Sequence, residues 1–430
     1  MRVGAVAVAV MLSVLVSVVV DRRAGAAPGT GCPTALYVAT YFAHPDPGDL
    51  ATVSVIDAAT DTVQGSPTTV GEDPTGIAIT PDGARAYVVT RGQHSVSVID
   101  TATRSVTTTI TSGFSDPYGV AITPDGTKAY VTNAGSTVSV IDTATNTVTK
   151  TITVGTNPIA VAVTPDGTKA YVTNVDDDTV SVIDTATDTV PGAPITVGTQ
   201  PWHLAFTPNG ATAYIVNAVS EDVSVIDTAT NAVTATIPVG SNLFGVAITP
   251  DGTKAYVTSA LPGTVEVIDT ATNTVTATIT VSGYPVGVVI TPDGTKAYVA
   301  QNAVGTIAVL DTATNTVSTT VTVGQEPQAI AVTPCVGLTA AVHSDGRTVA
   351  LTGTAFAPST TLTATIASTP LTLGTVAVPS TGAFTKTFAV PCTVTAGDHT
   401  ITTAAPSGQR ASATVTLAPC PVVLQPKFTG

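Results

Sequence analysis

The residue types that most often carry catalysis are few in this chain and lie far apart. The first 334 residues contain three of its histidines, His44, His94 and His203, in three separate segments. Their spacing does not match a zinc site, which takes its histidines and cysteines at short, regular intervals. The chain has no glycine-rich phosphate loop and no nucleophile elbow. These residues by themselves therefore predict no active site, no cofactor and no metal site.

The acidic run Asp176-Asp177-Asp178 is a second candidate for chemistry. Carboxylates bind calcium, but a calcium loop spaces its oxygen ligands over about twelve residues, and this run does not. We interpret it as a solvated acidic loop, with calcium binding as the alternative.

An internal repeat supplies the elements that must position any site. An Ile-Asp or Leu-Asp pair recurs at intervals of 42 or 43 residues. Its aspartates are Asp57, Asp100, Asp142, Asp184, Asp227, Asp269 and Asp311. A tyrosine keeps the same interval, at Tyr37, Tyr87, Tyr130, Tyr171, Tyr214, Tyr256 and Tyr298.

Each repeat unit holds four short runs rich in Val, Ile, Thr and Tyr, separated by turns such as Pro124-Asp125-Gly126. Such runs are typical of β-strands. Four strands in about 42 residues predict one blade of a β-propeller. The seven units therefore predict an all-β, seven-bladed β-propeller over residues 32–335.

The tyrosine run of each unit carries a family resemblance. Residues 130–133 and 171–174 both spell Tyr-Val-Thr-Asn, and mild variants such as Tyr214-Ile215-Val216-Asn217 occupy the other units. This motif resembles the YVTN-repeat propellers, which include YncE-like exported proteins and surface-layer-like proteins, and the resemblance covers residues 37–334. It implies an extracellular or periplasmic interaction scaffold and does not imply one shared reaction.

The ends of the repeat predict how the ring closes. The first unit lacks its opening strand, and a run of that type stands at the far end, at residues 328–334. We predict that this last strand completes the first blade. Cys32 and Cys335 lie where the turn that joins these strands elsewhere is missing, which predicts a Cys32–Cys335 disulfide. Cys392 and Cys420 then form the second pair, and the other two pairings of four cysteines stay open.

Beyond the repeat, residues 336–420 contain about seven β-like runs. Their spacing predicts a small β-sandwich. Together with the segment Leu351-Thr352-Gly353-Thr354, it resembles the immunoglobulin-like (Ig-like) modules of bacterial surface proteins. We interpret residues 421–430 as a tail.

The N-terminus predicts export. Arg2 precedes an apolar run from Val3 to Val20, and Ala24-Gly25-Ala26 is a small-residue cleavage site. Residues 1–26 are therefore predicted to be a signal peptide, with an uncleaved anchor as the alternative. The protein would be secreted or held at the cell envelope, with no membrane span after cleavage. The net charge of −14 excludes a nucleic-acid binder, which needs a basic surface for phosphates.

The loops at the two ends of the predicted blades differ in variability. Turns such as Pro-Asp-Gly and Asp-Thr-Ala-Thr are nearly uniform, and we interpret them as structural. The loops at the other end vary and hold the rare aromatic residues. One residue per unit is expected to ring the mouth of the central channel: Thr75, Tyr118, Ile159, Trp202, Phe244, Val286 and Gln328. The predicted ligand-binding residues are Tyr41, Phe42, Phe114, Tyr118, Trp202, His203, Phe244 and Tyr284.

Aromatic residues gathered on one varied face are typical of a binding surface, although they can also merely plug a channel. The sequence predicts a non-enzymatic binding or adhesion scaffold without a cofactor, whose partner is an extracellular glycan or protein. Two alternatives stay open: a structural surface-layer-like protein, and a propeller hydrolase or lyase with its site in the central channel.

Overall fold

The computed structural model describes residues 34–41, residues 51–334 and, between 337 and 417, seven strands with a few adjoining residues. The chain divides into two compact units, residues 1–335 and 336–430. Within the described part of the chain, no helix has the length and the apolar character needed to cross a membrane.

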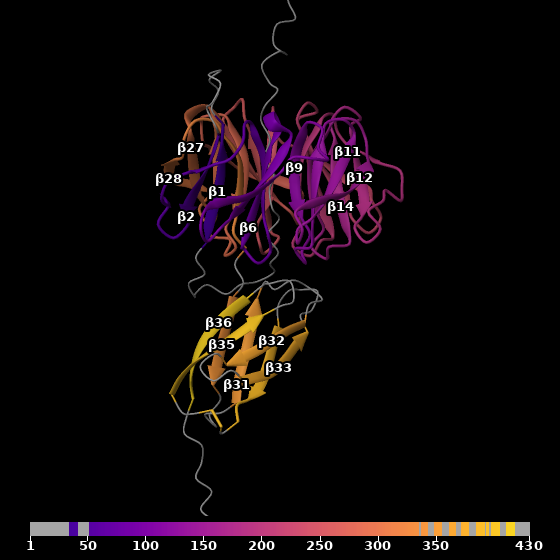
Figure 1. The fold of residues 1–430 in the computed structure, drawn as a ribbon. Coiled ribbons are helices and arrows are strands. Elements are labelled where there is room, and N and C mark those ends of the chain that lie inside the picture. The colour runs from indigo at the N-terminus through magenta and orange to yellow at the C-terminus, as the bar shows by residue number, and fades with distance from the viewer. Residues whose placement is uncertain are drawn as a thin grey trace, which may run out of the picture. The chain divides into compact units, whose positions relative to one another are not determined.

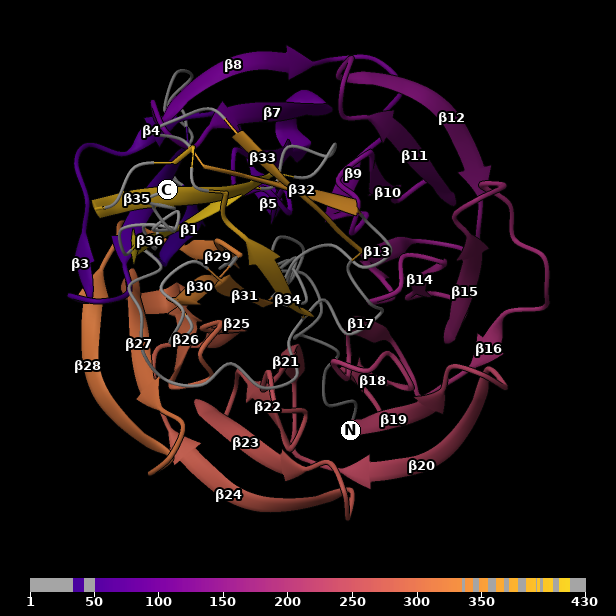
Figure 2. The same ribbon diagram turned by 90° about the horizontal axis from the view of Figure 1, so that it is seen from below.

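Seven antiparallel sheets surround a central axis in the first unit (Figures 1 and 2). The first blade contains β29 (Pro327–Val332), β1 (Ala35–Thr40), β2 (Thr52–Asp57), β3 (Thr62–Val63) and β4 (Thr68–Thr69). The second contains β5 (Pro74–Ile79), β6 (Arg85–Thr90), β7 (Ser95–Asp100) and β8 (Ser105–Ile110), and the third β9 (Pro117–Ile122), β10 (Lys128–Asn133), β11 (Thr137–Asp142) and β12 (Thr147–Thr153).

The fourth blade contains β13 (Pro158–Val163), β14 (Lys169–Asn174), β15 (Thr179–Asp184) and β16 (Ile195–Thr196). The fifth contains β17 (Pro201–Phe206), β18 (Thr212–Asn217), β19 (Asp222–Asp227) and β20 (Ala232–Pro238). The sixth contains β21 (Leu243–Ile248), β22 (Lys254–Ser259), β23 (Thr264–Asp269) and β24 (Thr274–Thr280), and the seventh β25 (Pro285–Ile290), β26 (Lys296–Gln301), β27 (Thr306–Asp311) and β28 (Thr316–Thr322). The prediction of an all-β, seven-bladed propeller is confirmed.

Burial explains why each unit forms this arrangement. The three inner strands of a blade are buried on both faces, as in β14, where every residue after Lys169 is buried. Their sequences are accordingly almost continuous in apolar and Thr residues. The outermost strand instead alternates exposed and covered residues, as in β24. Apolar side chains from neighbouring blades pack together, so the core is a ring of clusters between sheets.

The ring closes as predicted. β29 pairs with β1 in antiparallel register, with Leu36 opposite Val332 and Val38 opposite Ile330. The backbone N–H of Ala35 also donates to Thr333 Oγ1 at 2.8 Å. The four cysteines of the predicted disulfides, Cys32, Cys335, Cys392 and Cys420, all lie outside the described residues, so both pairings stay predictions.

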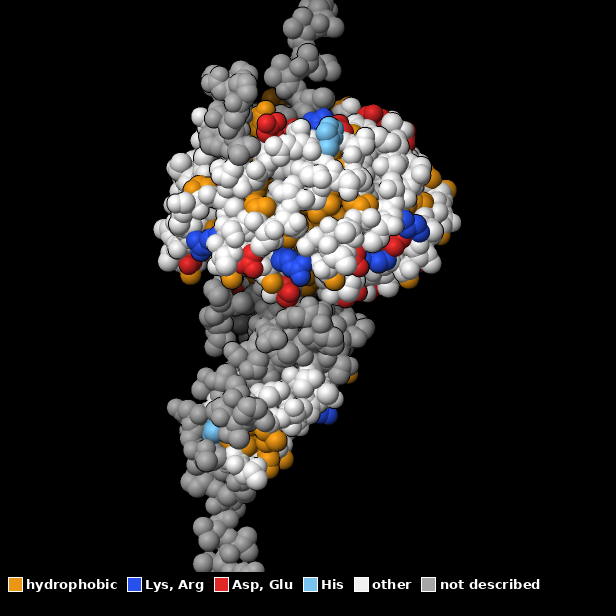
Figure 3. All heavy atoms as spheres, in the orientation of Figure 1, with side chains coloured by type: hydrophobic (Ala, Val, Ile, Leu, Met, Phe, Trp, Pro, Cys, Tyr) orange, Lys and Arg blue, Asp and Glu red, His pale blue; other side chains and the backbone are white. Residues whose placement is uncertain are grey.

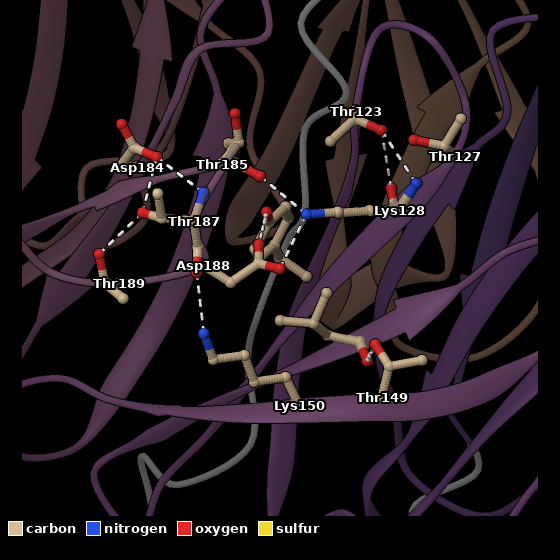
Figure 4. Close-up of polar contacts among 12 residues, drawn as sticks. Thr123, Thr127, Lys128, Thr149, Lys150, Asp184, Thr185, Thr187, Asp188 and Thr189 are labelled. Atoms are coloured by element: carbon tan, nitrogen blue, oxygen red, sulfur yellow. Dashed lines mark hydrogen bonds and ion pairs between the residues drawn. The ribbon is translucent and has the colours of Figure 1, made fainter.

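The repeated tyrosine joins each blade to the next one. Tyr130 Oη donates to Asp188 Oδ1 at 2.5 Å, and Lys128 Nζ, two residues earlier, contacts Asp188 Oδ2 at 2.7 Å (Figure 4). The same tyrosine contact reaches an Asp or Asn side chain in five other pairs: Tyr87–Asn146, Tyr171–Asn231, Tyr214–Asn273, Tyr256–Asn315 and Tyr298–Asp61. The recurring tyrosine therefore holds neighbouring blades together.

The second unit consists of two antiparallel sheets. One contains β30 (Gly337–Val342), β31 (Thr348–Thr354) and β34 (Phe384–Ala389). The other contains β33 (Leu371–Ala377), β32 (Thr361–Ile366), β35 (Gly397–Ala404) and β36 (Arg410–Leu417). Buried side chains of both sheets form one cluster, among them Leu351, Ile366 and Ile401. Whether this unit is Ig-like stays a prediction.

Candidate functional site

The variable loops of the seven blades share one backbone arrangement. In each blade, a backbone N–H at the start of the loop between the second and third strands donates to the C=O of the residue just before an innermost strand. Arg91 N to Asp73 O measures 2.9 Å, and Ala134 N to Asp116 O measures 3.0 Å. The accepting residue has a positive φ each time, for example 50° at Asp73. A uniform backbone thus presents different side chains around the propeller axis.

Two sets of side chains result. The mouth ring is the second residue of each innermost strand: Thr75, Tyr118, Ile159, Trp202, Phe244, Val286 and Gln328. The outer ring is the positive-φ residue that precedes each strand: Asp73, Asp116, Asn157, Gln200, Asn242, Tyr284 and Glu326. Figure 2 shows the seven innermost strands surrounding the centre.

Three aromatic side chains meet on one side of this face. The rings of Trp202 and Phe244 are stacked with centroids 5.7 Å apart, and the Phe244 and Tyr284 rings are also 5.7 Å apart. Trp202 is partly exposed, whereas Phe244 is buried. We call these three residues the aromatic sector. Aromatic faces of this kind pack against the apolar faces of ring-shaped ligands.

Acidic side chains gather on the other side, where the outer ring carries Glu326, Asp73 and Asp116 on consecutive blades. Arg91 lies between the two aspartates, with Nε 2.5 Å from Asp116 Oδ1 and Nη1 3.9 Å from Asp73 Oδ2. Its guanidinium also lies 4.3 Å from the centroid of the Tyr118 ring. We call Asp73, Arg91, Asp116 and Glu326 the acidic sector.

Burial raises the pKa of two carboxyl groups in this sector. It raises the pKa of Asp73 above its ordinary value, and the positive charge of Arg91 opposes that rise. Asp73 Oδ1 is buried and has no hydrogen-bond partner in the described part of the chain. Burial also raises the pKa of Glu326, and it raises the pKa of nearby Tyr41 together with the charges of Asp73, Glu326 and Glu72. Perturbed carboxyl groups of this kind are typical of proton-transfer sites.

A cavity of about 430 Å³ borders the acidic sector at Glu326. It lies between the loop 302–305 and the segment 322–326, and Asn302, Val304, Gln325 and Glu326 line it. Asn302 Nδ2 is buried there without a hydrogen-bond partner among the described residues. The cavity therefore lies against Glu326 of the acidic sector.

The predicted binding residues are only partly brought together. Trp202, Phe244 and Tyr284 contact one another, and Trp202 also packs against the cluster that contains Tyr118. Tyr41 donates its backbone N–H to Glu326 O at 3.2 Å, which places it beside the acidic sector. Phe42 and His44 lie outside the described residues.

Two other predicted residues lie away from the aromatic sector. His203 is 3 % exposed and paired in register with Val216, inside the blade. Phe114 packs against the buried cluster between the second and third blades. Their rarity in the sequence marked them as candidates, but burial decides their position.

The run Asp176-Asp177-Asp178 supports neighbouring loops. Asp177 Oδ2 accepts the backbone N–H of Thr156 at 2.6 Å, and Asp178 Oδ1 accepts that of Gln200 at 2.8 Å. In the described ranges, no group of three or more His, Cys, Asp or Glu side chains is arranged to hold a metal ion.

Sequence reasoning missed the acidic sector. Asp73 and Glu326 occupy positions where three other units carry Asn or Gln, and that difference was the available signal. Nothing in the sequence indicates that Arg91 lies between Asp73 and Asp116, because the three residues come from three different loops.

A family model of known proteins matches part of the propeller. The model of the lactonase family of seven-bladed β-propellers matches residues 36–239. No curated protein matches the chain.

Three solved structures have a fold similar to that of this chain. Hydrazine synthase of Kuenenia stuttgartiensis is 24% identical, with 65% of this chain and 92% of that chain covered and a TM-score of 0.56. A functionally unknown protein of Desulfotomaculum acetoxidans is 19% identical, with 71% of this chain and 100% of that chain covered and a TM-score of 0.59. A proposed 6-phosphogluconolactonase of Bacteroides uniformis is 18% identical, with 70% of this chain and 99% of that chain covered and a TM-score of 0.60. At these identities the solved structures establish the fold alone.

These findings correct two predictions made from the sequence. The expected non-enzymatic adhesion scaffold for a glycan or protein is wrong, and so is the expectation that the protein is not an enzyme. The match of the lactonase family model to residues 36–239 favours instead a propeller hydrolase, which was one of the alternatives. The prediction relied on histidines and metal-ligand spacing, which give no signal for carboxyl groups that come from separate loops.

Proposed function

We propose that this protein is a hydrolase that opens a lactone, a cyclic ester, at the acidic sector of the propeller. The observation that carries this proposal concerns the Asp73 carboxyl group. This group is largely buried, its pKa is raised, and it lies 3.9 Å from the Arg91 guanidinium. Such a pair combines a proton acceptor with a positive charge, which are the two groups that ester hydrolysis needs. The similarity to the lactonase family over residues 36–239 supports the same class.

The proposed reaction uses water as the nucleophile. The Asp73 carboxylate accepts a proton from a water molecule as that water attacks the lactone carbonyl carbon. Arg91 stabilises the negative charge that develops on the carbonyl oxygen. The bond from the carbonyl carbon to the ring oxygen then breaks, and the ring oxygen takes up a proton to become a hydroxyl. The products balance as one hydroxy acid from one lactone and one water.

Two further groups have roles in this proposal. Glu326, whose pKa burial raises above its ordinary value, donates the proton to the leaving ring oxygen. The aromatic sector holds the substrate ring by packing against its less polar face. Tyr118 contacts both Arg91 and the cluster next to Trp202, and so links the two sectors.

The test is hydrolysis of δ-gluconolactone by the full chain, followed by acid release in a pH-stat. Asp73→Asn removes the proton acceptor and keeps the shape of the side chain, so the rate should fall at least about a hundredfold. The matched control is Asp125→Asn, because Asp125 lies in a uniform turn at the opposite end of a blade. Equal rates for Asp73→Asn and wild type would contradict the proposal.

We also propose the finer assignments that the sequence motifs support. The Tyr-Val-Thr-Asn runs favour the YVTN-repeat, YncE-like branch of the propellers, and the two-sheet second unit agrees with an Ig-like module. The proposed boundaries are a signal peptide at 1–26, the propeller at 32–335, the module at 336–420 and a tail at 421–430. A secreted or cell-envelope location follows from the signal peptide. N-terminal sequencing of protein recovered from the culture medium tests it, with a mature chain expected to begin near Ala27.

A further inference from the structure

We infer that this site takes an uncharged, hydroxylated lactone rather than a phosphorylated one, and that Gln328 positions it. The inference rests on the proposed function and names the substrate class of the same site. Two independent observations carry the inference. One is the charge of the loop face, which is the face formed by the variable loops, and the other is a buried amide in the mouth ring that has no partner in the described structure.

The loop face is strongly acidic. Its described carboxylates are Glu72, Asp73, Asp116, Asp176, Asp177, Asp178, Glu221, Asp222 and Glu326. Within the described residues of these loops, Arg91 is the one Lys or Arg, and Asp73 and Asp116 already flank it. In Figure 3, acidic side chains lie at the upper rim of the propeller, beside a basic and a histidine side chain. A phosphate group would meet these carboxylates and only one guanidinium, that of Arg91, which the proposed reaction already assigns to the carbonyl oxygen.

Gln328 is a buried side chain with unused hydrogen-bonding capacity. It is 1% exposed, and neither Oε1 nor Nε2 has a partner in the described structure. Gln301 is buried to a similar degree, but its Nε2 donates to Val281 O and its Oε1 accepts from Thr306 Oγ1 at 2.8 Å. Because native proteins satisfy nearly all buried polar groups, an amide without a partner indicates a group that is completed by something else.

The position of Gln328 indicates what completes it. Gln328 belongs to the mouth ring and follows Glu326, the acidic-sector residue, by two positions in the chain. The other polar member of the mouth ring, Thr75, is already satisfied, because its hydroxyl donates to Tyr118 O at 2.9 Å. Of these two side chains, Gln328 is therefore the one whose hydrogen-bonding groups remain open to a ligand.

The chemistry of an amide matches an uncharged, hydroxylated ring. Its oxygen accepts a hydrogen bond from a substrate hydroxyl, and its nitrogen donates to a ring or carbonyl oxygen. Neither contact requires a charge on the substrate. Gln328 thus acts as a positioning residue, and Asp73 and Arg91 remain the groups at the reacting atoms.

The experiment uses a matched pair of ligands and a matched pair of variants in the full chain. The ligands are the δ-lactam of gluconic acid, an uncharged ring used here as an unreactive probe, and the same lactam phosphorylated at O6. Calorimetry measures their binding to wild type, Gln328→Met and the control Gln301→Met, and the two corresponding lactones are assayed for hydrolysis. Thermal unfolding of each variant without ligand reports on its folded state.

We expect the uncharged lactam to bind wild type more tightly than the phosphorylated one, and Gln328→Met to lose about tenfold in affinity. Without ligand, Gln328→Met should unfold at a higher temperature than wild type, because an unsatisfied amide has been removed. Gln301→Met should unfold at a lower temperature, because it removes the hydrogen bonds that the Gln301 amide makes. A structural role for Gln328 would not produce that opposite pair of shifts.

The outcomes separate this inference from the proposed function. Tighter binding of the phosphorylated lactam, or unchanged affinity in Gln328→Met, overturns the inference even if both lactones are hydrolysed. Binding of the uncharged lactam without hydrolysis of either lactone overturns the proposed hydrolase and leaves the ligand class supported. Absence of binding by either lactam overturns the inference as well.

Discussion

Tyr130 of the third blade donates its phenolic hydrogen to Asp188 of the fourth blade at 2.5 Å, and Lys128 contacts the other oxygen of the same carboxylate. Asp188 is held in a backbone conformation with a φ of 52°, in the turn that the repeated aspartate Asp184 supports. The tyrosine on one strand of each blade therefore forms a hydrogen bond with a turn of the next blade. The contact stabilises the ring and leaves the loops at the opposite face free to vary.

Tyr130→Phe should lower the free energy of unfolding by about 1.5–3 kcal/mol, because it removes a hydrogen bond to a charged group. Urea unfolding measures the loss. Tyr37→Phe is the matched control, since the Tyr37 hydroxyl donates only to the backbone oxygen of Thr101, at 3.2 Å. A loss in Tyr37→Phe as large as that in Tyr130→Phe would show that the carboxylate contact has no special weight.

Stability should fall in alkaline solution. Burial raises the pKa of Tyr171, Tyr214 and Tyr256 from 10.0 to about 12. A group with a raised folded-state pKa contributes stability that is fully present below its unfolded-state pKa and is lost as the pH rises toward the folded-state value. We therefore expect the urea midpoint to hold up to about pH 10 and to fall steadily between about pH 10 and pH 12. A midpoint that stays constant over that interval would contradict this linkage.

Arg91→Met should reduce lactone hydrolysis and change its pH dependence. The positive charge of Arg91 lowers the pKa of Asp73 against the effect of burial, so removing that charge raises the pKa further. The acid limb of the pH–rate profile should then move to higher pH, and the maximal rate should fall about a hundredfold or more with the loss of oxyanion stabilisation.

Arg104→Met is the control for the Arg91 variant, because Arg104 contacts the Gln64 carbonyl in a uniform turn away from the site. Arg91→Lys should restore part of the rate, since it returns the charge. An acid limb that does not move in Arg91→Met would show that Asp73 is not the proton acceptor.

Trp202→Ala should weaken substrate binding by about tenfold, because it removes the ring stacked on Phe244. The effect should appear in KM rather than in kcat, and Trp202→Phe should recover most of it. Phe114→Ala should leave KM unchanged although it lowers stability, because Phe114 packs between the second and third blades. Equal KM effects of the two alanine variants would place the binding surface elsewhere.

The blades follow from the sequence because their information is local and repeated. The alternation of β24, the apolar runs of β14 and the tyrosine of each unit all lie within about 42 residues, so periodicity alone predicts them. The closing strand was predictable for the same reason, since β29 has the pattern that the first unit lacks.

The site was predictable only in part. Trp202, Phe244 and Tyr284 stood out because aromatic residues are rare in this chain, and they do meet. The rarity of their residue types also made His203 and Phe114 candidates, but this signal was misleading, because packing inside the propeller holds both side chains away from the aromatic sector.

The sequence by itself determined the blades, their number and their order, because each blade depends on residues within its own unit. The tertiary structure decided which loop side chains share one site. Asp73, Arg91 and Asp116 meet because the ring brings three loops together, and closure of the ring sets the last innermost strand, which Glu326 precedes, beside the second blade. These contacts depend on distances across the ring, and spacing along the chain does not encode them.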